Sequence, residues 1–273
     1  MPVKKDFILN RIMQPNTPLK DFIQFAAECS ARGIEIRNDL PNSPLLGGIK
    51  PEDITALCKG LHVKIVTVNA LQKFNVPSLF EEKKRELAAM LDEAVSVDCR
   101  RIVLCPLNDI SDSRSEEQKH KDLTDALNEY APLFAERNAI GLLEPLGFET
   151  CSMRLKRQAV EAIHSCRAPE TYRILHDTFH HYLSGEKIMY PELTDLIHLS
   201  GVYAGKEKKD ITDADRVLPD DKDIMNNKEQ LSYMCNHGFS GYISFEPFSP
   251  QIQNLNGTIL KEKISRSMEY LFN

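Results

Sequence analysis

The sequence predicts a single (β/α)8 barrel of the TIM type, and three observations lead to this fold class. Short β-branched apolar runs alternate with longer stretches of helical periodicity, and no linker or change of composition divides the chain. This alternation requires a parallel sheet with helical crossovers. Eight repeats in 273 residues also agree with the roughly 250 residues typical of such a barrel. We therefore expect one barrel domain over residues 1–273.

The strands are expected where short apolar, β-branched runs are bounded by turn residues. In chain order they are 7–13, 33–38, 63–70, 101–106, 139–145, 173–177, 196–202 and 241–247. A doubly wound nucleotide-binding sheet is the competing architecture. It would carry G-x-G-x-x-G after its first strand, but residues 13–16 read Met-Gln-Pro-Asn, and no P-loop is present.

The helices are expected between these strands, where apolar residues recur at intervals of three and four. They are 18–31, 51–60, 80–96, 115–137, 155–166, a short helix near 190–196, 227–237 and 257–271. The clearest apolar face consists of Leu87, Met90, Leu91 and Ala94. Three helices run into a Gly or Asn just before a strand, which predicts left-handed C-cap residues at Gly33, Asn138 and Gly238.

The charge balance argues against a dedicated nucleic-acid-binding protein. The chain has 34 basic and 40 acidic side chains, a net charge of -6 and a pI near 5.8, whereas such proteins present a basic surface. The N-terminal residues lack the apolar stretch of a signal peptide, and no apolar run approaches the ~18 residues of a membrane span. Seven scattered cysteines without a C-x-x-C pair indicate reduced thiols in a cytoplasmic protein.

Four successive strands of the predicted barrel each end in a carboxylate or an imidazole. Glu144, Asp177, His198 and Glu246 follow or end the fifth to eighth strands, where barrels place their catalytic groups. One such residue alone is usually an ordinary polar group at the start of a loop. Four at equivalent positions favour a metal site, because three converging carboxylates need a cation to offset their repulsion. The donor set suits Zn²⁺, Mn²⁺, Mg²⁺ or Co²⁺ without ranking them.

Further polar side chains are expected at the same rim. His180 lies three residues after Asp177 and is expected to face the cavity, whereas His176 should point to the helices and His181 is expected to be solvated. Arg216 follows the seventh strand, and its segment is either a solvated loop or a clamp over the cavity.

The first three strands also end in polar residues, namely Asn10, Glu35, Arg37 and Asn69. Amides and a guanidinium suit substrate hydroxyl groups, but an ion pair of Glu35 with Arg37 or another neighbour explains them equally well. Asp213 and Asp215 lack the full pattern of a calcium loop, so no calcium site is expected.

Taken in order along the chain, these motifs resemble the xylose isomerase-like barrel superfamily, and within it the inosose (keto-inositol) isomerases of myo-inositol catabolism. The matching pieces run from the second strand to the eighth: Ile34-Glu-Ile-Arg37, Val68-Asn-Ala-Leu71, Leu143-Glu144, Asp177-Thr-Phe-His180, His198, Asp213-Ala-Asp-Arg216-Val and Ser244-Phe-Glu246-Pro-Phe. Each motif is short, and their order and spacing carry the resemblance over nearly the whole chain.

The resemblance implies a metal-dependent isomerase or epimerase that acts on a keto-inositol or ketose through an enediolate. Glu144, Asp177, His198 and Glu246 would bind one divalent metal ion, and Glu144 and Glu246 would also move protons. His180 would contact a substrate oxygen, and we expect Arg216, Asn69 and Arg37 to assist in binding. The expected partner is a small sugar or cyclitol, with no nucleic acid or membrane, and a homo-oligomer is left open.

Two departures from the relatives bear on the choice of substrate. Relatives commonly have a Pro-Gly-x-Gly turn after the arginine that corresponds to Arg216, whereas residues 219–222 of this chain read Pro-Asp-Asp-Lys. Relatives also often have an aspartate just after the histidine that corresponds to His198, and here Ser200 or Gly201 replaces it. A dehydratase and a non-catalytic sugar-binding barrel therefore stay open as alternatives. The superfamily's DNA-repair nucleases do not fit, because Asn69 and Cys105 stand near the strand ends where those enzymes place histidines.

Overall fold

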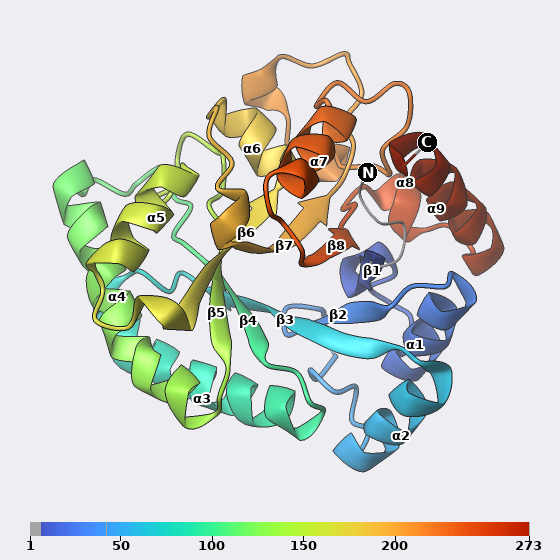
Figure 1. The fold of residues 1–273 in the computed structure, drawn as a ribbon, viewed down its shortest axis with the longest axis horizontal. Helices are drawn as coiled ribbons and strands as arrows, with labels where there is room; N and C mark the ends of the chain where they lie inside the picture. The colour runs from blue at the N-terminus through green and yellow to red at the C-terminus, as the bar shows by residue number, and fades with distance from the viewer. Residues whose placement is uncertain (1–6, 42, 273) are drawn as a thin grey trace.

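Eight parallel strands pair in sequence order, and β1 pairs with β8 to close a barrel (Figure 1). The computed structural model describes residues 7–41 and 43–272; residues 1–6, which entered the expectation that no signal peptide is present, lie outside this part, as do Asn42 and Asn273. The strands are β1 (Phe7–Asn10), β2 (Gly33–Arg37), β3 (Lys64–Gln72), β4 (Arg101–Cys105), β5 (Ile140–Leu143), β6 (Tyr172–Asp177), β7 (Thr194–Leu199) and β8 (Tyr242–Phe245). The predicted fold class is confirmed.

The helices form a ring around the barrel (Figure 1). They are α1 (Leu19–Glu28), α2 (Pro51–Leu61), α3 (Phe80–Ser96), α4 (Glu116–Glu136), α5 (Lys156–Ser165), α6 (Thr178–Ser184), α7 (Asn227–Asn236), α8 (Pro250–Gln253) and α9 (Gly257–Phe272). The expected apolar face of α3 is buried as predicted: Leu87, Met90, Leu91 and Ala94. At the start of α4, the Ser115 hydroxyl accepts a hydrogen bond from the Gln118 amide at 3.2 Å, which caps the helix.

The prediction of a helix near 190–196 is wrong. Pro191–Leu193 forms a single 3-10 turn, and the next residue begins β7. The helix of this repeat is α6, which starts directly after β6 without an intervening loop. Proline fits the first position of a helical turn, but the β-branched and apolar residues that follow continue as a strand.

The first strand is also shorter than predicted, because Arg11–Met13 forms a 3-10 turn. Left-handed residues occur at Asn138 and Gly238, as predicted, with φ of 48° and 105°. Gly33 is not one of them: α1 ends earlier and Ser30 takes the left-handed conformation at φ 61°. Gly33 instead starts β2, where a Cβ atom would lie 2.6 Å from the carbonyl oxygen of Lys64.

The barrel interior has an apolar layer below a polar one. The apolar layer is a cluster of buried side chains from six strands: Ile8, Val66, Ala70, Val103, Cys105, Leu142, Leu175 and Leu196. Side chains two residues apart on a strand share a face. Asn10, Asp177 and His198 therefore follow Ile8, Leu175 and Leu196 inside the barrel, one step nearer the carboxyl ends. This alternation carries the polar groups to the rim.

The seven cysteines all lie in the described part of the chain and are free thiols, as predicted. The described part of the chain contains no helix that is long and apolar enough to cross a membrane.

Candidate metal centre and pocket

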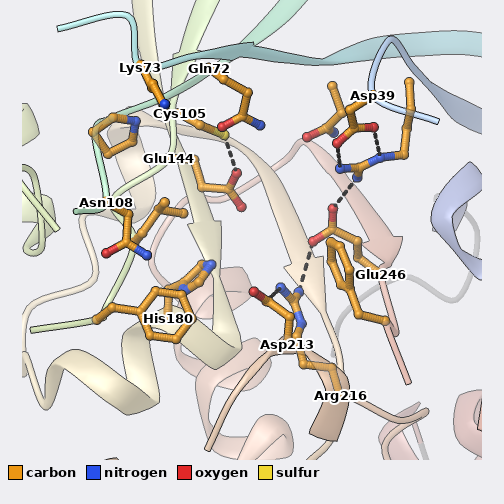
Figure 2. Close-up of a pocket in the computed structure, with 16 residues that line it drawn as sticks. Asp39, Gln72, Lys73, Cys105, Asn108, Glu144, His180, Asp213, Arg216 and Glu246 are labelled. Atoms are coloured by element: carbon orange, nitrogen blue, oxygen red, sulfur yellow. Dashed lines mark hydrogen bonds and ion pairs between the residues drawn. The ribbon is translucent and has the colours of Figure 1, made fainter. Parts of the chain in front are cut away.

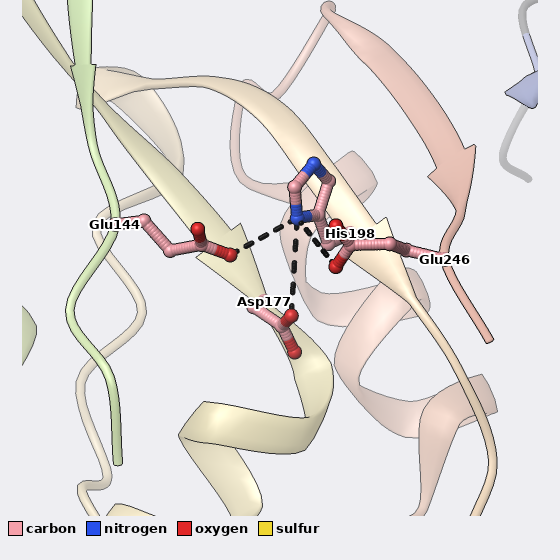
Figure 3. Close-up of side chains that lie close together, drawn as sticks. All are labelled: Glu144, Asp177, His198 and Glu246. Atoms are coloured by element: carbon pink, nitrogen blue, oxygen red, sulfur yellow. Dashed lines mark hydrogen bonds and ion pairs between the residues drawn. The ribbon is translucent and has the colours of Figure 1, made fainter. Parts of the chain in front are cut away.

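Four acidic and imidazole side chains meet at the carboxyl ends of the last four strands. Glu144 follows β5, Asp177 ends β6, His198 lies in β7 and Glu246 follows β8. All four are buried, and one ligand atom from each lies within 4.8 Å of the others (Figure 3). The structure thus brings together the whole set of metal ligands that the sequence predicts.

The His198 ring faces this cluster through Nδ1. That atom lies 3.0 Å from a Glu144 oxygen, 3.0 Å from a Glu246 oxygen and 3.9 Å from an Asp177 oxygen. One N–H group directs a strong hydrogen bond to only one of three such oxygens. Burial alone would lower the pKa of His198, but Glu246, Glu35 and Glu144 raise it well above its ordinary value. Three carboxylates around one imidazole nitrogen are a donor set that suits a divalent cation.

The Asp177 carboxylate serves two parts of the site. Its Oδ1 accepts hydrogen bonds from the amides of Phe179 at 2.7 Å and His180 at 3.1 Å, which caps α6. Its Oδ2 accepts a hydrogen bond from Arg216 at 2.7 Å. The residue that ends β6 therefore both starts α6 and faces the cluster.

Arg216 lies inside the site and is not part of a solvated loop. Its side chain is 1% exposed, and its Nη2 donates to Asp177 at 2.7 Å and to Glu246 at 2.9 Å. The guanidinium lies 4.8 Å and 4.7 Å from the ring centroids of Phe179 and Phe248. Burial alone would lower the pKa of Arg216, but these carboxylates raise it above its ordinary value. The clamp interpretation of this residue agrees with its position.

The polar residues that end the first strands form two groups of contacts, one around Arg37 and one around Glu35. Arg37 donates two hydrogen bonds to Asp39, at 2.8 and 2.7 Å, and one to Glu246 at 2.9 Å. Glu35 does not pair with Arg37; it lies deeper and contacts Nε2 of His198 at 3.1 Å. Asn69 donates to Glu35 at 2.9 Å. Of the two interpretations left open by the sequence, ion pairing describes these contacts, although Arg37 and Asn69 also line the pocket.

A pocket of about 290 Å³ opens above the cluster (Figure 2). Glu144 and Glu246 approach it from two sides, and His180 lines it from α6. Nδ1 of His180 is buried and has no hydrogen-bond partner among the described residues. The volume is at the small end of ligand pockets and the lining is rich in charged and amide groups, so the pocket suits a small polar molecule.

Several pocket residues were not singled out by the sequence, among them Asp39, Gln72, Lys73, Asn108 and Phe148. Cys105, read from the sequence as a plain thiol, lines the pocket and donates its S–H to Glu144 at 3.3 Å. Burial raises the pKa of Cys105 well above its ordinary value. The position of Cys105 at the end of β4 could have indicated this contact. Leu104 of β4 pairs with Leu143 of β5, so the residues that follow them, Cys105 and Glu144, lie at the same height in the barrel.

The other two histidines of this region face away from the pocket. His176 contacts Gln230 of α7 at 3.0 Å, as the strand alternation predicts. His181 is buried, which corrects the expectation of a solvated side chain, and its Nδ1 lies 2.7 Å from Nζ of Lys156. Burial, with the charge of Lys156, lowers the pKa of His181 to about 3.

The segment 219–222, the first departure from the pattern that the resemblance implies, does not line this pocket. It is fixed on the outside, where the Tyr203 hydroxyl donates to Asp220 at 2.5 Å and the Ser267 hydroxyl donates to the Pro219 carbonyl at 2.7 Å. Ser200, at the second departure, instead accepts a hydrogen bond from Nε of Arg216 at 3.0 Å. Of the two departures, only Ser200 contacts a pocket residue.

Gly147 holds α6 close to the loop that follows β5. A Cβ atom at this position would overlap the carbonyl oxygen of His180. We expect Gly147→Ala to lower the free energy of unfolding by about 1–3 kcal/mol, as overpacking does, in urea denaturation. Gly60→Ala is the matched control, because Gly60 lies in α2 with no atom within 4 Å of its added methyl group; it should be neutral or stabilising. Equal stability of the two variants would contradict this packing.

A closed parallel barrel with a buried acidic and imidazole cluster at the carboxyl rim defines a TIM barrel with a candidate metal centre. The chain belongs to the xylose isomerase-like TIM barrel family, whose model matches residues 23–272.

Among its relatives, an inosose isomerase of Halalkalibacterium halodurans is 25% identical over 201 residues, which are 71% of this chain and 70% of that protein. A xylose isomerase domain containing protein from Salmonella typhimurium is 30% identical, with a TM-score of 0.89 over 99% of this chain and 98% of the other. A structure of the IOLI protein with a bound zinc atom shares the fold, with a TM-score of 0.88, 21% identity and coverage of 97% of this chain and 98% of that one.

Proposed function

We propose that this protein is a divalent-metal-dependent isomerase or epimerase of a keto-inositol or ketose. The observation that carries the proposal is the buried cluster of Glu144, Asp177, His198 and Glu246 directly beneath a small polar pocket. The family and the inosose isomerase relative support the substrate class. The zinc atom of the IOLI protein supports a divalent ion, whose identity in this chain the donor set does not rank.

The two glutamates are the proton-transfer groups of the proposed reaction. A divalent ion held by the four residues would supply positive charge that stabilises the substrate oxygen as the neighbouring C–H bond breaks. Glu144 and Glu246 reach the pocket from different strands and from two sides (Figure 2). One carboxylate removes the proton on the carbon next to the carbonyl and yields an enediolate, and a carboxylic acid on the other side returns a proton.

The remaining pocket groups hold the substrate and the two bases. Nδ1 of His180 has no hydrogen-bond partner among the described residues and is free to contact a substrate oxygen. Arg37 and Arg216 both donate to Glu246 and so keep this carboxylate in place. Although burial alone would raise it, His198 and Arg216 hold the pKa of Glu246 well below its ordinary value. These contacts therefore keep Glu246 ionised in the metal-free protein.

The test is incubation of the Zn²⁺- or Co²⁺-loaded protein with an inosose in D₂O. We expect deuterium at the carbon next to the carbonyl, a product that otherwise keeps the substrate's mass, and loss of exchange after chelation with recovery on adding the ion. A product lighter by one water would assign a dehydratase. Thermal stabilisation by the inosose without exchange would assign a binding protein, and either result would overturn the proposal.

A further inference from the structure

We propose that Glu35 is a positioning residue for the metal centre. In this role Glu35 holds the His198 ring so that Nδ1 faces the cluster. The inference rests on the metal site of the proposed function. Glu35 lies on β2, whereas the four cluster residues come from β5 to β8, so the assignment depends on the barrel bringing these strands together.

The contacts of His198 show that Glu35 and the cluster lie on opposite edges of the ring. Nε2 is 3.1 Å from each carboxylate oxygen of Glu35. Nδ1, on the other edge, is 3.0 Å from Glu144 and from Glu246. With Nε2 engaged as a donor to Glu35, Nδ1 is the nitrogen that is left to bind a cation. Glu35 itself therefore lies outside the ligand sphere.

Glu35 is held rigidly by neutral donors from three other strands. Its carboxylate accepts hydrogen bonds from Asn10 at 3.1 Å, Asn69 at 2.9 Å, and the hydroxyls of Thr67 and Ser244. Its side chain is 0% exposed, and it is not among the residues that line the pocket. A side chain outside the pocket lining does not reach a molecule held there, so the proposed action of Glu35 is through His198.

A purely structural role does not account for this arrangement well. Among the described residues, no lysine or arginine forms a salt bridge with Glu35. A fully buried carboxylate is costly without a cation nearby. Among the described side chains that contact Glu35 directly, His198 is the one titratable group. A carboxylate that orients a ligating histidine is a recurrent feature of metal sites, and its loss typically weakens metal binding by about 10–100-fold.

The experiment is titration of metal-free protein with Co²⁺, with the visible absorption spectrum recorded at each step. We expect Glu35→Gln, which keeps the size of the side chain and removes its charge, to weaken Co²⁺ binding at least about tenfold and to change the spectrum. The matched control is Asp122→Asn, another buried carboxylate, which pairs with Arg114 and does not line the pocket. This control should bind Co²⁺ as the wild type does. Glu35→Gln with unchanged affinity and spectrum would overturn the inference.

A measurement on the wild type covers the case in which Glu35→Gln does not fold. In the Zn²⁺-loaded protein labelled with ¹⁵N at histidine, we expect His198 to carry its proton on Nε2 and the ion on Nδ1. A proton on Nδ1 overturns the role of Glu35 even when the protein binds zinc and turns over substrate. Absence of any Co²⁺ or Zn²⁺ binding by the wild type overturns both this inference and the proposed function, whereas binding without turnover overturns only the function.

Discussion

Glu246→Gln is expected to reduce the rate of deuterium exchange into substrate by about 10³-fold or more. The change removes one proton-transfer group, worth about 10²–10⁴-fold in general acid–base catalysis, and also one of the four candidate ligands. The amide has nearly the shape of the carboxylate and can still accept a hydrogen bond from Asn10, which contacts Glu246 at 3.0 Å. Exchange is measured by NMR in D₂O, and the far-ultraviolet circular dichroism should match that of the wild type.

The matched control for this variant is Glu149→Gln, at an exposed glutamate of the loop that follows β5. It removes the same charge outside the pocket that holds Glu246 and should leave exchange unchanged. If Glu246→Gln keeps more than a tenth of the wild-type rate, the two-glutamate mechanism is wrong.

Arg216→Met is expected to lower the free energy of unfolding of the metal-free protein by about 3–5 kcal/mol, as loss of one partner from a buried ion pair does. The guanidinium is the cation shared by Asp177 and Glu246. With saturating Zn²⁺ the loss should be clearly smaller, because the bound ion supplies positive charge to the same carboxylates. Urea denaturation with and without Zn²⁺ measures both values.

Arg137→Met provides the comparison for this prediction. Arg137 pairs with the exposed Asp92 at 2.8 Å, and exposed pairs contribute about 0–1 kcal/mol. Its effect should be small and independent of Zn²⁺. An equal loss for Arg216→Met in both conditions would show that the arginine and the ion do not act on the same charges.

The cluster was predictable from the sequence because the catalytic groups of a TIM barrel lie at the carboxyl ends of its strands. Only the residues at predicted strand ends therefore had to be considered. Once the alternation of strands and helices indicates a barrel, Glu144, Asp177, His198 and Glu246 occupy equivalent places in four successive repeats. Parallel register then brings them to one height, which Asp177 and His198 show directly as paired residues of β6 and β7.

The contact between Glu35 and His198 was not predictable in the same way. Glu35 and Arg37 are two residues apart and both face the interior, so the sequence does not say which one reaches His198. That is decided by depth in the barrel and by the register shift between β2 and β3 at Ile34 and Glu35. Arg37, nearer the rim, reaches Asp39 and Glu246.

Helix α6 was missed although its signals are present in the sequence. Asp177 is an N-cap residue, and Gly185 takes the left-handed conformation after the last turn at φ 71°. The helix has only seven residues and begins at the strand end itself, so no apolar periodicity separates it from β6. A short helix without a preceding loop offers too few residues for a periodic pattern to emerge.

The two carboxylate oxygens of Asp177 connect the proposed binding of a substrate with the proposed binding of a metal ion. One oxygen fixes the first turn of α6, which carries His180, and the other faces the cluster. A ligand held by His180 and a cation held by Asp177 thus share one side chain. By thermodynamic reciprocity, any factor by which the cation changes the affinity for the ligand is the factor by which the ligand changes the affinity for the cation. For the ion and the substrate of the proposed function, these two factors are therefore equal.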